Sequence, residues 1–241
     1  WNDKKLESKK MWSIPNNDFK AFENYFSKKG LYQQFISILK NNRIDLKNKT
    51  VLSLASGTCA LESKILKNFS KINKMICVEF SVHRIKDIAP KILNHYSINP
   101  KKIDLNLGSF YNLDLDDNSM DLIILSQAFH HADQPHSLLS EIKRVLKKNG
   151  KVIMIGEHHF NFIDVVKKVI FYYFRFFKSN NYYNKKLIPN WQSLFPPDKI
   201  KGDIHYSNSE YRKFFKEHGF AFKRQLFKDF KRQGFCLEFL K

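Results

Sequence analysis

One stretch of the chain limits its possible folds more than any other: Val51-Leu-Ser-Leu-Ala-Ser-Gly-Thr-Cys-Ala60, with Glu79 nineteen residues after its end. An apolar run of strand length reaches a turn of small residues, and a helix-like segment follows. A second apolar run, Met75 to Val78, ends at Glu79. In such a strand–turn–helix unit, backbone N–H groups at the helix start bind an anionic group, and the acid accepts hydrogen bonds from ribose hydroxyls. The pattern therefore predicts a site for an adenosine-containing cofactor.

Strand-like and helix-like segments alternate between residues 50 and 156. The apolar periodicity predicts strands over 50–55, 75–80, 103–108, 120–126 and 151–156. Between them it predicts helices over 61–69, 82–94 and 136–146, the last ending at Asn149-Gly150. Repeated units of this kind imply parallel strands joined by right-handed crossovers. We therefore expect a doubly wound core.

The segments on either side of this core follow a different pattern. Residues 18–40 predict two helices separated by Gly30, so we treat 1–49 as an N-terminal helical cap and 50–241 as the main domain. The remaining segments read as an aromatic helix, a polar loop, a helix and two strands, over 160–177, 178–206, 209–218, 220–227 and 234–240. The predicted fold is α/β: a doubly wound, mostly parallel seven-stranded sheet. A helical insertion, 157–206, precedes the last helix.

The charge is strongly positive but unevenly distributed. The chain has 42 Lys and Arg against 23 Asp and Glu, a net charge of +19. Residues 51–157 carry 14 cations against 11 acids, whereas residues 158–241 carry 17 against 7. A basic surface attracts nucleic acid, anionic lipid or phosphorylated substrates. Only 7 of the cations are Arg, the residue that bidentate phosphate recognition favours, so nucleic acid is the less favoured partner.

Cysteine usage and the longest apolar stretch bear on the compartment. Cys59, Cys77 and Cys236 are far apart and lack metal-ligand spacing, which favours a reducing, cytoplasmic setting. The longest apolar stretch, Val169 to Phe177, is interrupted by Arg175 and is too short to span a bilayer. We therefore predict no transmembrane segment.

The ordered motifs over about 105 residues carry a family resemblance. The matching segments are Val51 to Ala60, Val78-Glu-Phe-Ser81, Gly108-Ser-Phe110, Asp117 to His131, and His136 to Ile155. This series resembles class I S-adenosylmethionine-dependent methyltransferases, especially the small-molecule branch related to quinone-biosynthesis methyltransferases. The resemblance implies a Rossmann-like methyltransferase fold, S-adenosyl-L-methionine as cofactor and a small-molecule acceptor.

The resemblance also implies roles for individual residues. The turn residues Ala55, Ser56 and Gly57 would lie beneath the methionine part of the cofactor, and Glu79 would accept the two ribose hydroxyls. Ser53 would lie near the cofactor amino group, Phe80 against the adenine, and Ser109 and Phe110 at the adenine edge. Ser126 and Gln127 would lie near the sulfonium. The family usually has an acid where Ser53 stands, and glycines where Ala55 and Cys59 stand. These departures predict weaker or shifted cofactor contacts.

Histidines supply the candidate acid–base groups. His130 and His131 follow the fourth predicted strand, and we expect one of them to orient or deprotonate the acceptor, because imidazole titrates in the range that proton transfer needs. His158 and His159 are secondary candidates. A capping or core role for His130 and His131 stays open. None of these pairs has helical metal spacing, so we predict no metal.

Several readings stay open. A nicotinamide-dependent oxidoreductase partly fits Ala55-x-Gly57-x-x-Ala60 with Glu79. A non-catalytic methyltransferase-like protein that binds a partner or RNA fits the eroded glycine turn and the basic flanks. For the aromatic helix we consider three roles: an amphipathic helix packed on the core, a lid over an apolar acceptor, or a helix at a membrane surface.

Overall fold

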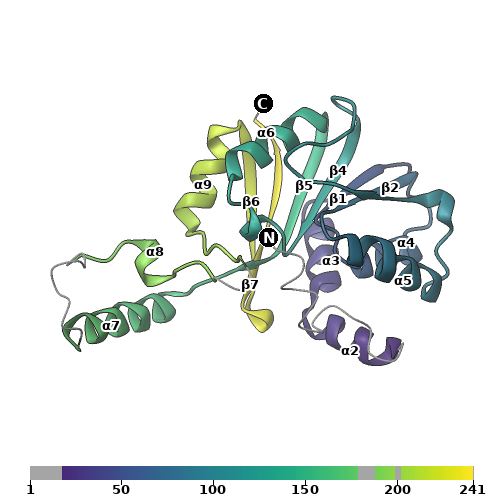
Figure 1. The fold of residues 1–241 in the computed structure, drawn as a ribbon. Coiled ribbons are helices and arrows are strands. Elements are labelled where there is room, and N and C mark those ends of the chain that lie inside the picture. The colour runs from purple at the N-terminus through teal and green to yellow at the C-terminus, as the bar shows by residue number, and fades with distance from the viewer. Residues whose placement is uncertain (1–17, 179–187, 199–201, 241) are drawn as a thin grey trace.

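The computed structural model describes residues 18–178, 188–198 and 202–240 (Figure 1). Seven strands form one sheet with the order β3-β2-β1-β4-β5-β7-β6. Only β7 runs antiparallel to its neighbours, so the predicted mostly parallel seven-stranded sheet is confirmed. The strands are β1 Thr50–Leu54, β2 Lys74–Glu79, β3 Ile103–Leu107, β4 Met120–Ser126, β5 Leu146–His158, β6 Phe220–Phe227 and β7 Arg232–Phe239.

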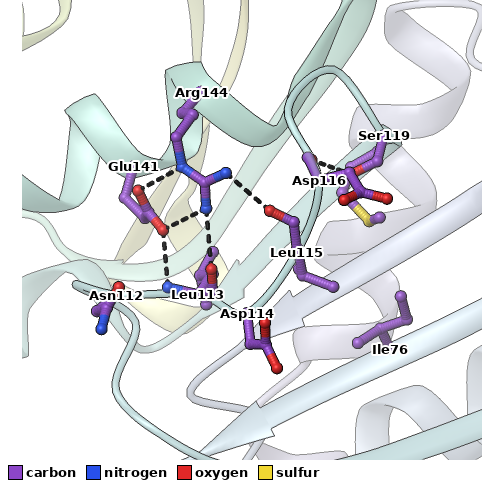
Figure 2. A pocket seen from close by; sticks show the side chains of 10 residues that line it. Ile76, Asn112, Leu113, Asp114, Leu115, Asp116, Ser119, Glu141 and Arg144 are labelled. Carbon is purple, nitrogen blue, oxygen red and sulfur yellow. Dashed lines mark hydrogen bonds and ion pairs between the residues drawn. The ribbon is translucent and has the colours of Figure 1, made fainter.

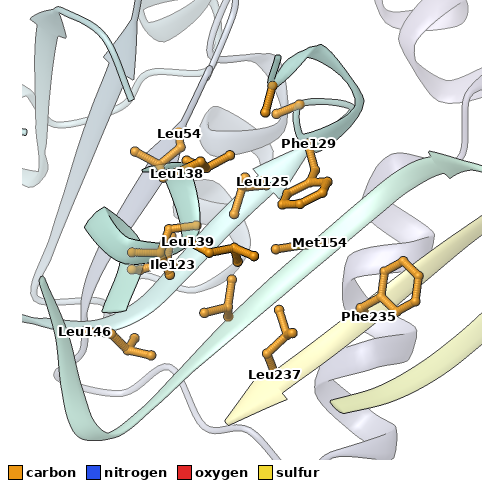
Figure 3. Packing of buried hydrophobic residues seen from close by; sticks show 14 of the residues in the cluster. Leu54, Ile123, Leu125, Phe129, Leu138, Leu139, Leu146, Met154, Phe235 and Leu237 are labelled. Atoms are coloured by element: carbon orange, nitrogen blue, oxygen red, sulfur yellow. The ribbon is translucent and has the colours of Figure 1, made fainter. Parts of the chain in front are cut away.

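Helices cover both faces of this sheet. One buried cluster joins the sheet to α3, α4 and the η2–α5 segment. A second cluster, part of which is drawn in Figure 3, joins the sheet to α6 and α9. The helices are α2 Phe19–Lys28, α3 Leu31–Asn41, α4 Ala60–Asn68, η2 His83–Ile88, α5 Ala89–His95, α6 Pro135–Val145, α7 Phe162–Lys178, α8 Trp191–Leu194 and α9 Asn208–Glu217.

The central strands are apolar along their whole length because both of their faces are covered. In β4, Ile123 and Leu125 belong to the cluster under α6, whereas Leu122 and Ile124 belong to the cluster under α3 and α4. All four side chains are buried. This is the burial expected of a parallel strand between two helical layers, and it explains the continuous apolar run in the sequence.

The predicted end of α6 at Asn149-Gly150 is wrong. The helix ends at Val145, and Leu146 already has an extended backbone and pairs with Met120 in β4. The next pair is Leu122 with Lys151, so the four residues after Leu146 form a bulge at the start of β5. Leu146 is fully buried. We attribute the early end of the helix to this residue, because its extended backbone lets it pair with β4 while its side chain stays in the core.

The predicted pair of N-terminal helices is confirmed. They are separated by Gly30, whose φ of 63° lies in the left-handed region that favours glycine. The ring of Phe230 occupies the space that a Cβ at this position would need. In α3, Leu31, Phe35 and Ile38 are buried in the same cluster as the sheet residues of β1, β4 and β5.

The insertion leaves the sheet at the end of β5. Figure 1 shows α7 and α8 lying apart from the sheet, with the chain returning through residues 202–207 to α9. On the return, the backbone N–H of Ile204 donates to the carbonyl of His130 at 2.7 Å, and the Tyr206 hydroxyl donates to the carbonyl of Ala132 at 2.5 Å. The returning segment is therefore fastened to the loop that follows β4.

Candidate functional site

The predicted cofactor residues lie at one edge of the sheet. They occupy the carboxyl ends of β1, β2, β3 and β4, which are neighbours in the order β3-β2-β1-β4. The strand order reverses between β1 and β4, and ligands of open α/β sheets bind outside the strand ends at such a reversal. The fold therefore brings these segments together: Ser53 to Gly57, Glu79 and Phe80, Ser109 and Phe110, and Ser126 and Gln127.

The turn after β1 has three residues in the left-handed backbone region. Their φ angles are 52° at Ala55, 60° at Gly57 and 56° at Cys59. Left-handed backbone costs a residue with a Cβ about 1–2 kcal/mol. Ala55 and Cys59 are the two positions where the resembled family has glycine, so the turn keeps the shape that glycines usually provide. At Gly57, among the described residues, no atom beyond those of its two chain neighbours lies within 4 Å of where a Cβ would be, so the tip of the turn is open.

Glu79 joins this turn to the end of β2. Its Oε2 accepts the Gly57 N–H at 2.7 Å, and its Oε1 accepts the Ser81 N–H at 3.0 Å. A guanidinium nitrogen of Arg84 lies 3.8 Å from Oε1. A carboxylate has about four lone-pair sites, so this buried group retains capacity for further donors. Phe80, the next residue, is 55% exposed.

A carboxylate is present near Ser53 although the strand itself lacks one. The Ser53 hydroxyl donates to Oε1 of Glu62, from α4, at 2.6 Å, and both residues are buried. Among the described residues, the other Glu62 oxygen, also buried, has no hydrogen-bond partner. Burial raises the pKa of Glu62 to about 7, and the charge of Glu79 acts in the same direction. Sequence reasoning missed Glu62 because it looked for an acid only within β1.

The loop after β3 holds Ser109 and Phe110 beside the loop after β4. The Ser109 hydroxyl accepts the Tyr111 N–H at 3.2 Å, and the Phe110 ring packs edge-on against the Tyr111 ring at 4.6 Å. The Tyr111 hydroxyl donates to Asp133 at 2.6 Å. This contact fixes the position of the half-buried Phe110 relative to the residues that follow β4.

Gln127 directly follows β4 and has a strained backbone conformation. Its φ is 53°, and its N–H donates to the carbonyl of Ile155 in β5 at 2.8 Å. Its side-chain oxygen accepts a hydrogen bond from Lys29 at 3.3 Å, so the segment before α3 reaches this edge of the sheet. Ser126 directly precedes it and is partly exposed. Non-glycine residues with this backbone concentrate at functional sites.

His130 is buried and held by a carboxylate. Its Nδ1 lies 3.0 Å from Oε2 of Glu157, which is fully buried at the end of β5. Glu157 also accepts the Tyr211 hydroxyl at 2.8 Å and the Phe129 N–H at 3.2 Å. Because an ionised carboxylate only accepts, Nδ1 carries the proton and Nε2 of a neutral ring is the acceptor. Burial alone would raise the pKa of Glu157, but the neighbouring His130 imidazole and the hydrogen bonds from His130 and Tyr211 lower it.

His131 and His158 meet the insertion at Asp203. The distances to the Asp203 carboxylate are 3.3 Å from His131 Nδ1 and 3.5 Å from His158 Nε2. Burial alone would raise the pKa of Asp203, but the neighbouring imidazoles of His158, His130 and His131 lower it to about 2. Burial lowers the pKa of His131 to about 4, and the neighbouring His130 imidazole acts in the same direction. His131, which follows β4, and His158, at the end of β5, thus lie beside the same carboxylate.

His159 lies elsewhere in the hydrogen-bond network. Its Nδ1 is 3.0 Å from a guanidinium nitrogen of Arg224 in β6. His205, which the sequence did not single out, packs edge-on against His158 at 4.8 Å. Asp203 and His205 carry no local signal, because they lie about seventy residues from His130 in a loop. Glu157 could have been found, since it is an acid at the end of a buried strand, as Glu79 is.

Three groups in this cluster are close enough to be considered as metal ligands. His130, His131 and Asp203 each offer one ligand atom, and the three atoms lie within 4.8 Å of one another. In the structure, however, Nδ1 of each histidine faces a carboxylate, Glu157 or Asp203, so imidazole–carboxylate contacts already account for the cluster. The prediction that no metal is bound stays a prediction.

A cavity of about 590 Å³ lies at the other end of β4, near its first residue Met120 (Figure 2). Arg144 spans one wall and donates to the carbonyls of Leu113 and Leu115 and to the carboxylate of Glu141. Glu141 also accepts the Leu113 N–H at 2.7 Å. The Arg144 motif therefore fixes the loop between β3 and β4, which carries the predicted adenine contacts, and does not belong to the cofactor edge.

Comparisons with known proteins agree with this geometry. Residues 52–154 match the family described as methyltransferase domain. An uncharacterised methyltransferase of Schizosaccharomyces pombe is 31% identical over 119 residues, which is 49% of this chain and 43% of that protein. The chain thus spans less than half of that relative's length.

Two further proteins resemble more of the chain. The ubiquinone/menaquinone biosynthesis C-methyltransferase of Wigglesworthia glossinidia brevipalpis is 26% identical over 174 residues, covering 68% of this chain and 69% of that protein. The putative methyltransferase of Haloferax volcanii, solved in complex with the Trm112 activator, has the same fold with a TM-score of 0.61. It is 16% identical and covers 93% of this chain and 97% of that one. With the strand order, these findings show that residues 52–154 are similar to a methyltransferase domain and that the chain shares the fold of a solved methyltransferase.

Proposed function

We propose that this protein transfers a methyl group from S-adenosyl-L-methionine to a small-molecule acceptor. The proposal rests on the turn at Gly57, whose tip is open and whose N–H donates to the Glu79 carboxylate. Both residues lie within the segment that matches a methyltransferase domain. Fold alone would not support an activity, but a site of this chemistry at the strand reversal does.

The residues present fit the cofactor. An amino-acid tail would lie over Ala55, Ser56 and Gly57, where space is open and the turn leads into α4. Glu79 would accept the ribose hydroxyls with its remaining lone pairs. The adenine would lie against Phe80, which is more than half exposed and therefore free to receive it, with Ser109 and Phe110 at its edge. Ser126 and Gln127 would lie near the reacting centre.

When bound, the cofactor supplies an electrophilic methyl group on a positively charged sulfur. The protein's task is to hold the acceptor in line with that methyl and to exclude water. We assign His130 to orienting or deprotonating the acceptor, because Glu157 fixes its tautomer and leaves Nε2 as the acceptor atom. His131 would serve the same end from the adjacent position.

The test of this function has a binding arm and a turnover arm. Isothermal titration should show heat with S-adenosylhomocysteine and none with NADH; heat with NADH alone would favour the oxidoreductase alternative. In the turnover arm, label from methyl-labelled cofactor should enter a small-molecule acceptor pool. Replacing both His130 and His131 with Asn should lower turnover about 10²–10⁴-fold and leave S-adenosylhomocysteine binding unchanged. The exposed His136→Asn is the matched control.

A second candidate is a methyltransferase-like protein that binds a partner or RNA and is inactive alone. Both oxygens of Glu79 already accept backbone N–H groups, and the turn holds two strained non-glycine residues. The Haloferax volcanii protein of the same fold is complexed with an activator. Absence of S-adenosylhomocysteine binding, together with a gel shift of tRNA or rRNA fragments that weakens steeply with salt, would favour this candidate.

A further inference from the structure

Helix α7 carries an exposed apolar surface that the proposed catalytic site does not use. Seven of its large apolar side chains are exposed to solvent, and Phe176 is buried. The exposed fractions are 81% for Phe162, 62% for Ile163, 38% for Val166, 63% for Ile170, 54% for Phe171, 61% for Phe174 and 64% for Phe177. Burying a single such side chain is worth about 1.5–3 kcal/mol, so this exposure points to a missing partner.

Six of these side chains share one side of the helix. At about 100° per residue, Phe162, Ile163, Val166, Ile170, Phe174 and Phe177 fall within an arc of about 120°. We call these six residues the α7 apolar face. Phe171 lies outside the arc, beside Arg175, whose guanidinium lies 5.5 Å from the ring centre.

The protein itself covers a different side of α7. The helix packs against the short helix α8, and Lys168 lies over the Phe195 ring at 5.7 Å. Val165 and Val169 are half-buried, on the side next to the α7 apolar face. Figure 1 shows the helix apart from the sheet. Of the three roles considered for this helix, packing on the core as an ordinary amphipathic helix does not fit this position.

Cations border the α7 apolar face. By the same helical spacing, Lys167 and Lys178 follow directly after the arc, with Arg175 and Lys168 further round. The Lys178 ammonium lies 5.9 Å from the Phe174 ring centre, so its aliphatic stem runs along the apolar surface while its charge lies at the edge. Apolar side chains flanked by such cations are the composition of a helix that lies in a membrane interface.

We propose that α7 is an interfacial helix that docks this protein onto an anionic lipid bilayer through the α7 apolar face. Charge complementarity selects this occupant: the chain carries a net charge of +19, and 17 cations stand against 7 acids in residues 158–241. A second copy would bring two such basic helices together, and protein interfaces are depleted in lysine. No helix among the described residues is long and apolar enough to cross a bilayer, so α7 lies on the surface.

The experiment is co-sedimentation of the full chain with vesicles. One set contains phosphatidylcholine alone, and the other contains equal parts of phosphatidylcholine and phosphatidylglycerol. We expect binding to the mixed vesicles, weaker binding to the neutral ones, and weakening with salt. The double variant Ile170→Glu/Phe174→Glu should lower the affinity for mixed vesicles more than 10-fold, because together the two substitutions place two negative charges at the acyl boundary. Leu226→Glu, an exposed apolar position on β6, is the matched control and should have no effect.

A charge series tests the electrostatic part. Lys167→Gln and Lys178→Gln should each lower the affinity for mixed vesicles about 5-fold. Lys213→Gln, an exposed lysine on α9, should change it much less. Thermal unfolding of each variant checks that the fold is retained. We expect it to be retained because the substituted side chains are exposed.

Three outcomes would overturn the proposal. They are no binding to mixed vesicles, equal binding by the wild type and the Ile170/Phe174 variant, and self-association through α7 in sedimentation velocity without vesicle binding. Cofactor binding is measured separately, so a failure of the methyltransferase proposal would leave vesicle binding intact, and the two failures are distinguishable.

Discussion

Ala55 shows how a single side chain can be tolerated in a turn built for glycine. Its φ of 52° has a cost, yet the turn keeps its shape because Ser56 N–H donates to Val78 O and Gly57 N–H donates to Glu79. Ala55→Gly should raise the free energy of unfolding by about 0.5–1 kcal/mol, as relief of left-handed strain exceeds the added chain entropy. Urea unfolding measures this. Ala60→Gly, at the start of α4, is the control and should destabilise by a similar amount.

Glu62 predicts an unusual dependence of stability on pH. Its folded pKa is about 7 against an ordinary 4.5, so between these values the folded protein holds a proton that the unfolded chain releases. This residue's contribution therefore falls as pH rises from 4.5 to 7. Glu62→Gln should gain stability over wild type across that window, by at most about 3 kcal/mol, with little gain below it. A gain that is the same at both ends, measured by urea unfolding, would contradict the assignment.

The imidazole–carboxylate contacts lead to a prediction about metals. Because Glu157 and Asp203 already face the Nδ1 atoms of His130 and His131, the cluster needs no cation to balance its charge. Dialysis against EDTA should leave the melting temperature and S-adenosylhomocysteine affinity unchanged. Stoichiometric zinc or iron by elemental analysis, lost together with stability on dialysis, would show that this expectation is wrong.

At the scale of elements, Glu157 connects the end of β5 to the turn after β4 and to α9. It does so through His130, the Phe129 N–H and the Tyr211 hydroxyl. Glu157→Gln should destabilise the protein by about 3 kcal/mol, because it breaks a buried charged network, whereas Tyr211→Phe should cost about 1 kcal/mol. Differential scanning calorimetry or urea unfolding measures both. If Tyr211→Phe were as costly as Glu157→Gln, the network would not be centred on Glu157.

The elements that the sequence predicted best are those whose signals are local. Continuous apolar runs such as Leu122 to Leu125 predict buried strands, and the motif after each strand places its residues at the same sheet edge. The end of α6 was mispredicted because Asn149-Gly150 is a local stop signal, while the buried pairing of Leu146 with Met120 is a tertiary one.

Long-range partners could not be read from the sequence. Asp203 reaches His131 only because the insertion folds back and Ile204 bonds to His130. Glu62 reaches Ser53 only because α4 turns its buried side toward β1. The position of α7 was likewise unpredictable, since its periodicity is the same whether the apolar side meets a core or a bilayer.

On the scale of the whole molecule, the chain separates two chemistries. A sheet edge with few excess charges holds the motif residues, and the basic, aromatic insertion extends from β5 on one side of it. Arg144 and its partners hold the loop at the opposite end of the strands. The Arg144 motif therefore has a structural role, whereas the motifs at the carboxyl ends of the strands form the candidate site.

The most direct test of the central claim is a crystal structure with S-adenosylhomocysteine. It should show the ribose hydroxyls at the Glu79 carboxylate and the amino-acid tail over the turn at Gly57. A ligand bound at another place, or a crevice filled by side chains at these two residues, would contradict it.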